Sequence, residues 1–256
     1  MKAAIFVKPG EMTVKDVEKP VIEKKTDAII RVLRACVCGS DLWWYRGIAK
    51  REQGSTVGHE AIGIVEEVGD DVTAVKPGDT TVVIGDGAVG LCGVIGARLR
   101  GAKRVILMSH HADRAALGKE FGATDIVSER GDDAVKKVME LTQGRGADSV
   151  QECVGAISAI EQAGQVARPG AIVGRVGVPQ TEPASNQMFW KNIGLRGGIA
   201  SVTTYDKNVL LKAVLDGRIN PGKVFTKRFD LDHVQDAYAA MDKREAIKSL
   251  LIVSEK

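Results

Sequence analysis

Residues 80–90 read TTVVIGDGAVG, and this stretch decides the fold. An apolar, strand-like run over 81–84 leads directly into the pattern GxGxxG, and a helical segment follows over 88–101. In that context the first glycine permits a tight turn, the second lets a pyrophosphate approach the backbone, and the third lets the helix pack on the strand. A glycine-rich turn without a ligand is the alternative. The flanking strand and helix favour a dinucleotide-binding site built by Gly85, Gly87, Ala88, Val89 and Gly90.

Apolar strands and helical segments alternate from residue 80 to residue 217. Such alternation is typical of a parallel sheet with helices on both faces. We therefore predict an α/β fold, with a Rossmann domain over 80–217 and a six-stranded, doubly wound parallel sheet. After the first strand, the pattern predicts strands at 104–109, 125–128, 148–155, 171–178 and 192–200, with a helix over 156–170 before the fifth.

The flanking segments have a different pattern. Residues 1–79 show short strands separated by turns, at 3–7, 28–35 and 61–69. The tail shows a strand at 224–229, a helix over 230–243 and a strand at 247–253. We expect residues 1–79 and 218–256 to form a second, β-rich domain beside the Rossmann domain.

The end of the second Rossmann strand bears on the choice of cofactor. NAD(H) usually meets an acidic residue there, but this strand ends at Ser109, followed by His110, His111 and, one helical turn on, Arg114. A hydroxyl and several potential cations suit the 2′-phosphate of NADP(H), which we therefore prefer to NAD(H). Alternatively the two histidines are solvated loop residues, and Arg114 alone would hold a phosphate.

Composition excludes several classes of protein. The 256 residues include 36 basic and 33 acidic side chains without a long run of one charge, so we expect no nucleic-acid partner. No stretch is apolar and long enough for a membrane span, and the apolar run at the N-terminus is too short for a secretory signal. The four cysteines form no CxxC pair, which favours a reducing cytoplasm.

A second group of chemically active residues lies in the β-rich part. Cys38 precedes the pair His59-Glu60 by twenty-one residues. A thiolate and an imidazole are zinc ligands, and a carboxylate can ligate zinc or support another ligand. On spacing alone, a buried cysteine and a loop histidine explain the pattern better.

Several strings give this group more weight. The sequence resembles the zinc-dependent medium-chain alcohol dehydrogenases over nearly its whole length, because it carries, in the family's order, CGSD, GHE, KPGD, GDGAVG, ECVG and VGRVGVP. The resemblance implies that Cys38 and His59 are catalytic zinc ligands, that Glu60 can exchange onto the metal, and that Ser40 relays the alcohol proton. It also implies a GroES-like fold for the β-rich part.

The same resemblance implies the reaction. Hydride would pass between a nicotinamide cofactor and a small or medium alcohol, or the matching aldehyde or ketone, with zinc as the Lewis acid. It places five residues of the fourth and fifth strand ends near the nicotinamide, although plain strand-end packing is the alternative: Val154, Gly155, Val176, Gly177 and Val178.

The chain departs from the family in the β-rich part. His59 and Gly85 are only twenty-six residues apart, whereas family members place much of their catalytic domain between these positions. The missing segment would carry the structural-zinc lobe and the third ligand of the catalytic zinc, so Glu60 or an outside group must complete the site. Trp43 also replaces a histidine of the proton relay. Lost strands leave sheet edges uncovered, so we expect a homo-oligomer.

Two other functions remain open. The chain could be an NADP(H)-binding remnant that no longer turns over, and bound zinc with a third ligand would argue against this. A zinc-independent quinone reductase-type relative is a further alternative, against which Cys38 and His59 argue. The aromatic run Trp43-Trp44-Tyr45 suits either an apolar substrate pocket or a core.

Overall fold

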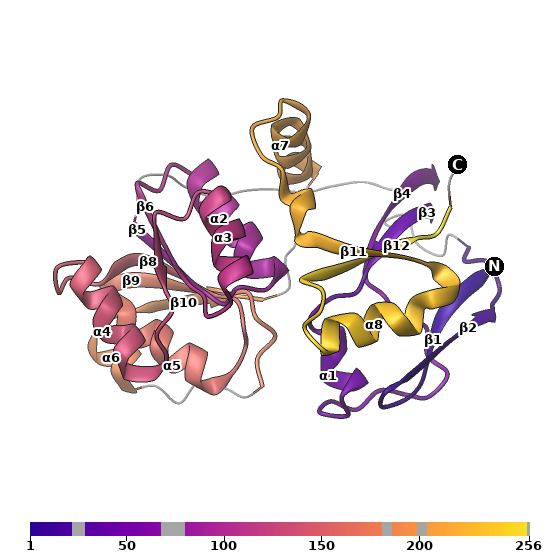
Figure 1. Cartoon of the computed structure of the whole chain (residues 1–256), viewed down its shortest axis with the longest axis horizontal. Helices are drawn as coiled ribbons and strands as arrows, with labels where there is room; N and C mark the ends of the chain where they lie inside the picture. The colour runs from indigo at the N-terminus through magenta and orange to yellow at the C-terminus, as the bar shows by residue number, and fades with distance from the viewer. Residues whose placement is uncertain (22–28, 68–79, 181–185, 199–203, 255–256) are drawn as a thin grey trace. The chain divides into compact units, whose positions relative to one another are not determined.

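The computed structural model describes residues 1–21, 29–67, 80–180, 186–198 and 204–254. It divides into two compact units, Met1–Asp71 with Gly222–Lys256 and Val72–Pro221 (Figure 1). The boundary expected between residues 79 and 80 adjoins a segment, 68–79, outside the described residues. The second boundary lies between Pro221 and Gly222 rather than between residues 217 and 218.

The larger unit contains the predicted six-stranded parallel sheet, with strand order β10-β9-β8-β5-β6-β7. Its order, in which the chain steps outward in one direction and then returns to the first strand before stepping in the other, is the doubly wound Rossmann topology. The prediction of this fold is confirmed. The strands are β5 (Thr80–Ile84), β6 (Arg104–Met108), β7 (Asp125–Val127), β8 (Ala147–Glu152), β9 (Ala167–Arg175) and β10 (Gly194–Gly197).

Helices cover both faces of this sheet. Helix α2 packs with α3, and α4 packs with α5 (Figure 1). Because both faces are covered, the central strands are apolar on both sides, as Val82, Val83 and Ile106 show with no exposed surface. The helices are α2 (Ala88–Leu99), α3 (Ala112–Glu120), α4 (Gly131–Leu141), α5 (Ile157–Val166), α6 (Asn186–Trp190) and α7 (Thr204–Leu215).

The predicted boundary between α5 and β9 is wrong. The helix expected over 156–170 ends at Val166, and β9 begins directly at Ala167. Pro169 disfavours helical backbone at Arg168, which explains the early end. The short helix α6 was not predicted, because five residues give too few turns for a periodic pattern.

The smaller unit contains a two-stranded antiparallel sheet, β1-β2, and a four-stranded sheet of order β11-β12-β3-β4. Helix α8 packs on β2, β11 and β12. Strand β2 and helix α1 were not predicted. The elements are β1 (Lys2–Lys8), β2 (Glu11–Asp16), β3 (Ile29–Cys36), α1 (Asp41–Tyr45), β4 (Glu60–Glu67), β11 (Phe225–Asp230), α8 (Val234–Asp242) and β12 (Lys248–Ile252), with 3-10 turns at Pro221–Val224 and Leu231–His233.

Aromatic side chains form the core of this smaller unit. Trp44 lies between Phe6 and Tyr238, with ring centroids 5.2 and 5.6 Å away, and Tyr45 also stacks against Tyr238. Trp44 and Tyr45 are buried, whereas Trp43 is half-buried. Two of the three residues in the aromatic run therefore belong to the core rather than to a substrate pocket.

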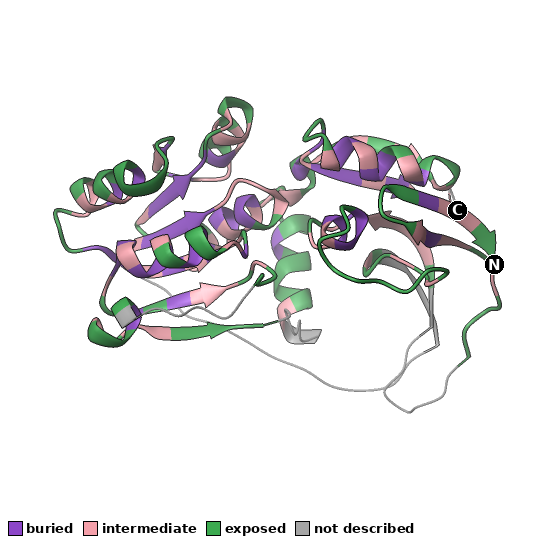
Figure 2. Cartoon of the chain, turned by 90° about the horizontal axis from the view of Figure 1, so that it is seen from below, coloured by how far each residue is buried: buried purple, intermediate pink, exposed green. Residues whose placement is uncertain are grey.

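Burial differs sharply between elements of the larger unit (Figure 2). The central strands are buried, while α7 leaves a series of apolar side chains exposed: Val209, Leu210, Leu211, Val214 and Leu215. In the described part of the chain, no helix has the length and apolar character needed to cross a membrane.

Candidate functional site

Strand pairing brings the candidate metal ligands together in the smaller unit. Strands β3 and β4 are antiparallel, and Cys36 pairs with Glu60. Cys38 follows the end of β3, and His59 precedes the start of β4. The pairing of β3 with β4 therefore brings together Cys38 and His59, which are twenty-one positions apart in the sequence.

The three side chains converge on one point. A sulfur of Cys38, a ring nitrogen of His59 and a carboxylate oxygen of Glu60 all lie within 4.8 Å of one another. Among the described residues, this is the one group of three or more His, Cys, Asp or Glu side chains with such spacing. Thiolate, imidazole and carboxylate are the donors that zinc prefers, so the residues present fit a zinc ion.

Ser40 lies beside two of these donor atoms. Its hydroxyl is 3.2 Å from the Cys38 sulfur and 3.4 Å from Nε2 of His59. A hydroxyl can donate and accept, which a proton relay at this position requires.

Asp41, which was not predicted as a site residue, contacts both His59 and the backbone of Cys38. Its side chain is only 2% exposed, and one oxygen lies 3.3 Å from Nδ1 of His59. The other accepts the Cys38 backbone N–H at 3.0 Å and lies 3.4 Å from the Tyr238 hydroxyl. A carboxylate on Nδ1 leaves the Nε2 lone pair free for a metal. The string CGSD, which ends at Asp41, was the one sequence signal for this acid, but its contact with His59 depends on the pairing of distant segments.

Lys248 also contacts the group. Its ammonium forms an ion pair with Oε2 of Glu60, and the lysine side chain is only 9% exposed. Lys248 comes from β12, the strand that pairs with β3 in the same sheet. The pair balances the Glu60 charge and holds that carboxylate beside the other two donors. The position lies far along the chain from Glu60, so sequence spacing gave no signal for it.

The protonation of Cys38 follows from its surroundings. Burial raises the pKa of the Cys38 thiol, and hydrogen bonds from Ser40 offset part of this effect. Asp41 behaves similarly: burial raises its pKa, although the Cys38 N–H and His59 act in the opposite direction. A bound zinc ion would favour the thiolate over the thiol.

The glycine motif of the larger unit has the backbone that a phosphate cradle requires. Gly85 has φ of +106°, and a Cβ at that position would lie 2.8 Å from Val154 Cγ2. A Cβ on Gly90 would overlap the Gly85 carbonyl, whereas one on Gly87 would meet no protein atom within 4 Å. Gly87 is the N-cap of α2. The space above it is thus open toward the helix N-terminus, where an anion is favoured.

The five residues expected at the nicotinamide end are also neighbours. A Cβ on Gly155 would lie 1.9 Å from the Val178 carbonyl oxygen, and one on Gly177 would lie 2.3 Å from the Gly155 nitrogen and 2.6 Å from backbone atoms of Val154, so there is no room for a side chain at either glycine. The side chains of the three valines among them are 44 to 50% exposed. These apolar groups therefore line the carboxyl ends of β8 and β9.

Glu152, not predicted as a site residue, fixes this turn. It is fully buried, and its Oε1 atom accepts the backbone N–H groups of Val154 and Gly155, each at 2.7 Å. The carboxylate thereby sets the backbone that follows β8.

The residues at the end of β6 do not all point the same way. The Ser109 hydroxyl donates to Asp86 at 2.9 Å, and Arg114 lies 3.5 Å from the same carboxylate. Nδ1 of His111 is 2.7 Å from Asp86. The His110 ring contacts the Ser128 carbonyl instead, at 2.7 Å. Sequence reasoning missed Asp86, because it occupies a variable position inside the glycine motif.

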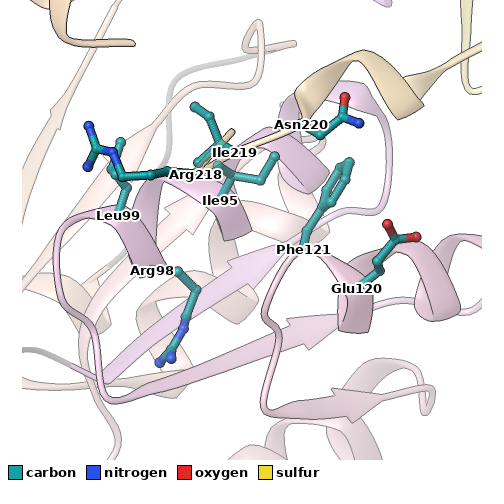
Figure 3. A pocket seen from close by; sticks show the side chains of 8 residues that line it. All are labelled: Ile95, Arg98, Leu99, Glu120, Phe121, Arg218, Ile219 and Asn220. Atoms are coloured by element: carbon teal, nitrogen blue, oxygen red, sulfur yellow. The ribbon is translucent and has the colours of Figure 1, made fainter. Parts of the chain in front are cut away.

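A cavity of about 400 Å³ lies elsewhere in the larger unit (Figure 3). None of its lining residues belongs to the candidate site. They come from the C-terminal ends of α2 and α3 and from the segment after α7: Ile95, Arg98, Leu99, Glu120, Phe121, Arg218, Ile219 and Asn220.

Comparison with known proteins identifies the family. Residues 24–117 match the alcohol dehydrogenase GroES-like domain, and residues 88–210 match the zinc-binding dehydrogenase family. The structure is similar to alcohol dehydrogenase TADH from Thermus sp. ATN1, with a TM-score of 0.87 at 24% identity, over 99% of this chain and 100% of that chain.

Two curated relatives show how the lengths compare. An alcohol dehydrogenase from Cupriavidus necator is 23% identical over 93% of this chain and 94% of its own length. That alignment has 347 positions, more than the 256 residues of this chain, so part of the relative has no counterpart here. An NADP-dependent isopropanol dehydrogenase from Clostridium beijerinckii is 32% identical over 72% of this chain, which spans only 55% of that relative.

Both family matches, the shared fold and these relatives lead to one assignment. The chain belongs to the zinc-type alcohol dehydrogenases of the medium-chain dehydrogenase/reductase family, oxidoreductases that act on CH–OH groups.

Proposed function

We propose that the chain transfers hydride between NADP(H) and a small or medium alcohol, or the corresponding aldehyde or ketone, at a zinc ion held by Cys38, His59 and Glu60. The observation that carries the proposal is the convergence of these three donors within 4.8 Å, with the Ser40 hydroxyl 3.2 Å from the Cys38 sulfur. NADP-dependent isopropanol dehydrogenases among the relatives support the substrate class and the cofactor.

Each residue has a distinct task. Cys38, His59 and Glu60 would hold the zinc ion, which would supply Lewis-acid polarisation of the substrate oxygen, and the dinucleotide would supply the hydride chemistry. Ser40 moves the alcohol proton, since its hydroxyl lies next to the donor atoms. Asp41 orients the His59 ring, and Lys248 orients the Glu60 carboxylate.

The dinucleotide lies, in this proposal, across the carboxyl ends of the Rossmann strands. The pyrophosphate would rest over Gly87 at the N-terminus of α2, where the space is open. Ser109 and Arg114 would face the adenosine ribose, which supports NADP(H), while NAD(H) is the second candidate. The turn that Glu152 holds would place Val154 and Val178 against the nicotinamide.

The alternative is an NADP(H)-binding protein without turnover. It is favoured by the length of the relative that has no counterpart in this chain. In the alternative, Glu60 stays paired with Lys248 and does not ligate a metal.

An activity measurement separates the two. The zinc-loaded chain is incubated with NADP⁺ and a series of small secondary and primary alcohols, and formation of reduced nicotinamide is followed. We expect turnover by the wild-type chain, at least about a hundredfold loss in Cys38→Ala, and little change in the matched control Cys36→Ala. Dinucleotide binding without any turnover would support the remnant instead.

A further inference from the structure

In the part of the chain that the structure describes, Asp86 is the one acidic residue whose side chain contacts the residues expected at the adenosine ribose. It lies in the loop between β5 and α2, inside the glycine motif, and its side chain is 12% exposed. It contacts three side chains from the end of β6 and the start of α3: Ser109, His111 and Arg114. An acid and the cations expected to bind phosphate therefore form one cluster.

The carboxylate is held firmly in its charged form. Burial by itself would raise the pKa of Asp86, but the hydrogen bonds from His111 and Ser109 and the charge of Arg114 lower it overall. Its negative charge is thus present throughout the neutral range. Any group that carries negative charge into this cluster must compete with Asp86 for Arg114 and His111.

The two oxygens of Asp86 are used differently. Oδ2 accepts from both Ser109 and His111, at 2.9 and 2.7 Å. Oδ1 has a single long contact among the described residues, 3.5 Å from Nη1 of Arg114. A carboxylate offers about four acceptor positions, so Oδ1 can still accept a hydroxyl.

In the proposed function, on which this inference rests, the adenosine ribose of the cofactor lies at the cluster formed by Asp86, Ser109, His111 and Arg114. We propose that Asp86 is the specificity-determining residue of the dinucleotide site. Its Oδ1 atom accepts the ribose 2′-hydroxyl of NAD(H), and its charge partly neutralises the cations that would otherwise select the 2′-phosphate of NADP(H). Asp86 therefore does from inside the glycine motif what an acid at the end of the second strand does in other dinucleotide-binding proteins. The chain accepts both cofactors because of it.

The test is a comparison of two variants that each remove one negative charge near α3. Asp86→Asn keeps the shape and an acceptor oxygen, whereas Asp113→Asn changes an exposed residue in the first turn of α3. NADPH and NADH are titrated into each full-length protein by nicotinamide fluorescence. We expect Asp86→Asn to tighten NADPH binding by about tenfold and to weaken NADH binding severalfold. Asp113→Asn should leave the ratio of the two dissociation constants within about twofold of wild type.

Other outcomes are equally decisive. An unchanged ratio in a folded Asp86→Asn protein, or an equal shift in Asp113→Asn, would overturn the specificity role alone. If the wild-type chain binds neither dinucleotide, the proposed function fails together with the inference. A third variant keeps the test valid if Asp86→Asn does not fold: Arg114→Gln should weaken NADPH binding severalfold and leave NADH binding unchanged, and equal effects on both would contradict the inference.

Discussion

Each side chain of the metal group has a neighbour that restrains it, and for His59 and Glu60 that neighbour is distant in sequence. Asp41 fixes His59, Lys248 pairs with Glu60, and the Ser40 hydroxyl contacts Cys38. Because each donor has a partner that restrains it, little ordering of side chains is left for metal binding. The arrangement therefore favours a preformed zinc site over one assembled by the ion.

Burial and the Ser40 hydroxyl have opposite effects on the pKa of the Cys38 thiol. In metal-free protein, burial raises the pKa of the thiol above its usual value of about 9, and Ser40 lowers it again in part. Removing the hydroxyl removes the lowering effect, so Ser40→Ala should shift the thiol pKa further upward. The pH dependence of Cys38 alkylation by iodoacetamide, followed by mass spectrometry, measures this. A midpoint that moves downward in Ser40→Ala would contradict the assigned contact.

Among the helices and loops, α2 and the loop before it form the proposed dinucleotide site. The helix begins at Ala88 with Gly87 as its N-cap, and Gly90 packs directly on the loop at Gly85. Gly87 and Gly96 share one property, since a Cβ at either would meet no protein atom within 4 Å. They differ in position, because Gly96 lies in the last part of the helix.

This pair gives a matched test of the phosphate cradle. Gly87→Ala should fold as stably as wild type but bind either dinucleotide about ten- to a hundredfold more weakly, because the methyl group enters the space assigned to the pyrophosphate. Gly96→Ala should bind the dinucleotide normally and gain about 0.5–1 kcal/mol of stability. Thermal unfolding and fluorescence titration measure both effects. Equal dinucleotide affinities in the two variants would argue against the cradle.

Much of the Rossmann unit could be predicted from sequence because its signals are local. The strand, glycine motif and helix at 80–101 follow one another directly, and the order of the sheet follows from the alternation. Contacts between residues that are far apart in the chain could not be predicted, because no local sequence pattern marks them. Asp86 and Lys248 act through tertiary pairing, and helix α1 has only five residues. The end of α5 depended on a single proline effect at Arg168, which the helical pattern concealed.

At the scale of the whole molecule, the chain keeps the family fold with fewer residues than its relatives. The larger unit also exposes apolar surface near one edge of its sheet. Among the described strands, β10 lies at one edge of the sheet and β7 at the other, and Phe189 and Trp190, in the short helix before β10, are 77% and 80% exposed. Large exposed aromatics beside an unpaired strand edge favour association.

We therefore predict that the chain forms a homo-oligomer through this region. Sedimentation at micromolar concentrations should give a mass above that of one chain, and the double variant Phe189→Ser with Trp190→Ser should reduce it. Val21→Ser, which removes an apolar side chain that is 72% exposed in the other unit, serves as the control and should leave the mass unchanged. A monomeric wild-type chain would contradict the prediction.

The zinc content of the purified chain tests the account most directly. Elemental analysis of wild type is compared with His59→Ala, which removes one donor, and with Cys36→Ala, which removes a neighbouring thiol outside the donor group. We predict about one zinc per chain in wild type and in Cys36→Ala, and a large loss in His59→Ala. A wild-type chain that binds NADPH but retains no zinc under conditions of zinc excess would contradict the dehydrogenase assignment and leave a dinucleotide-binding protein.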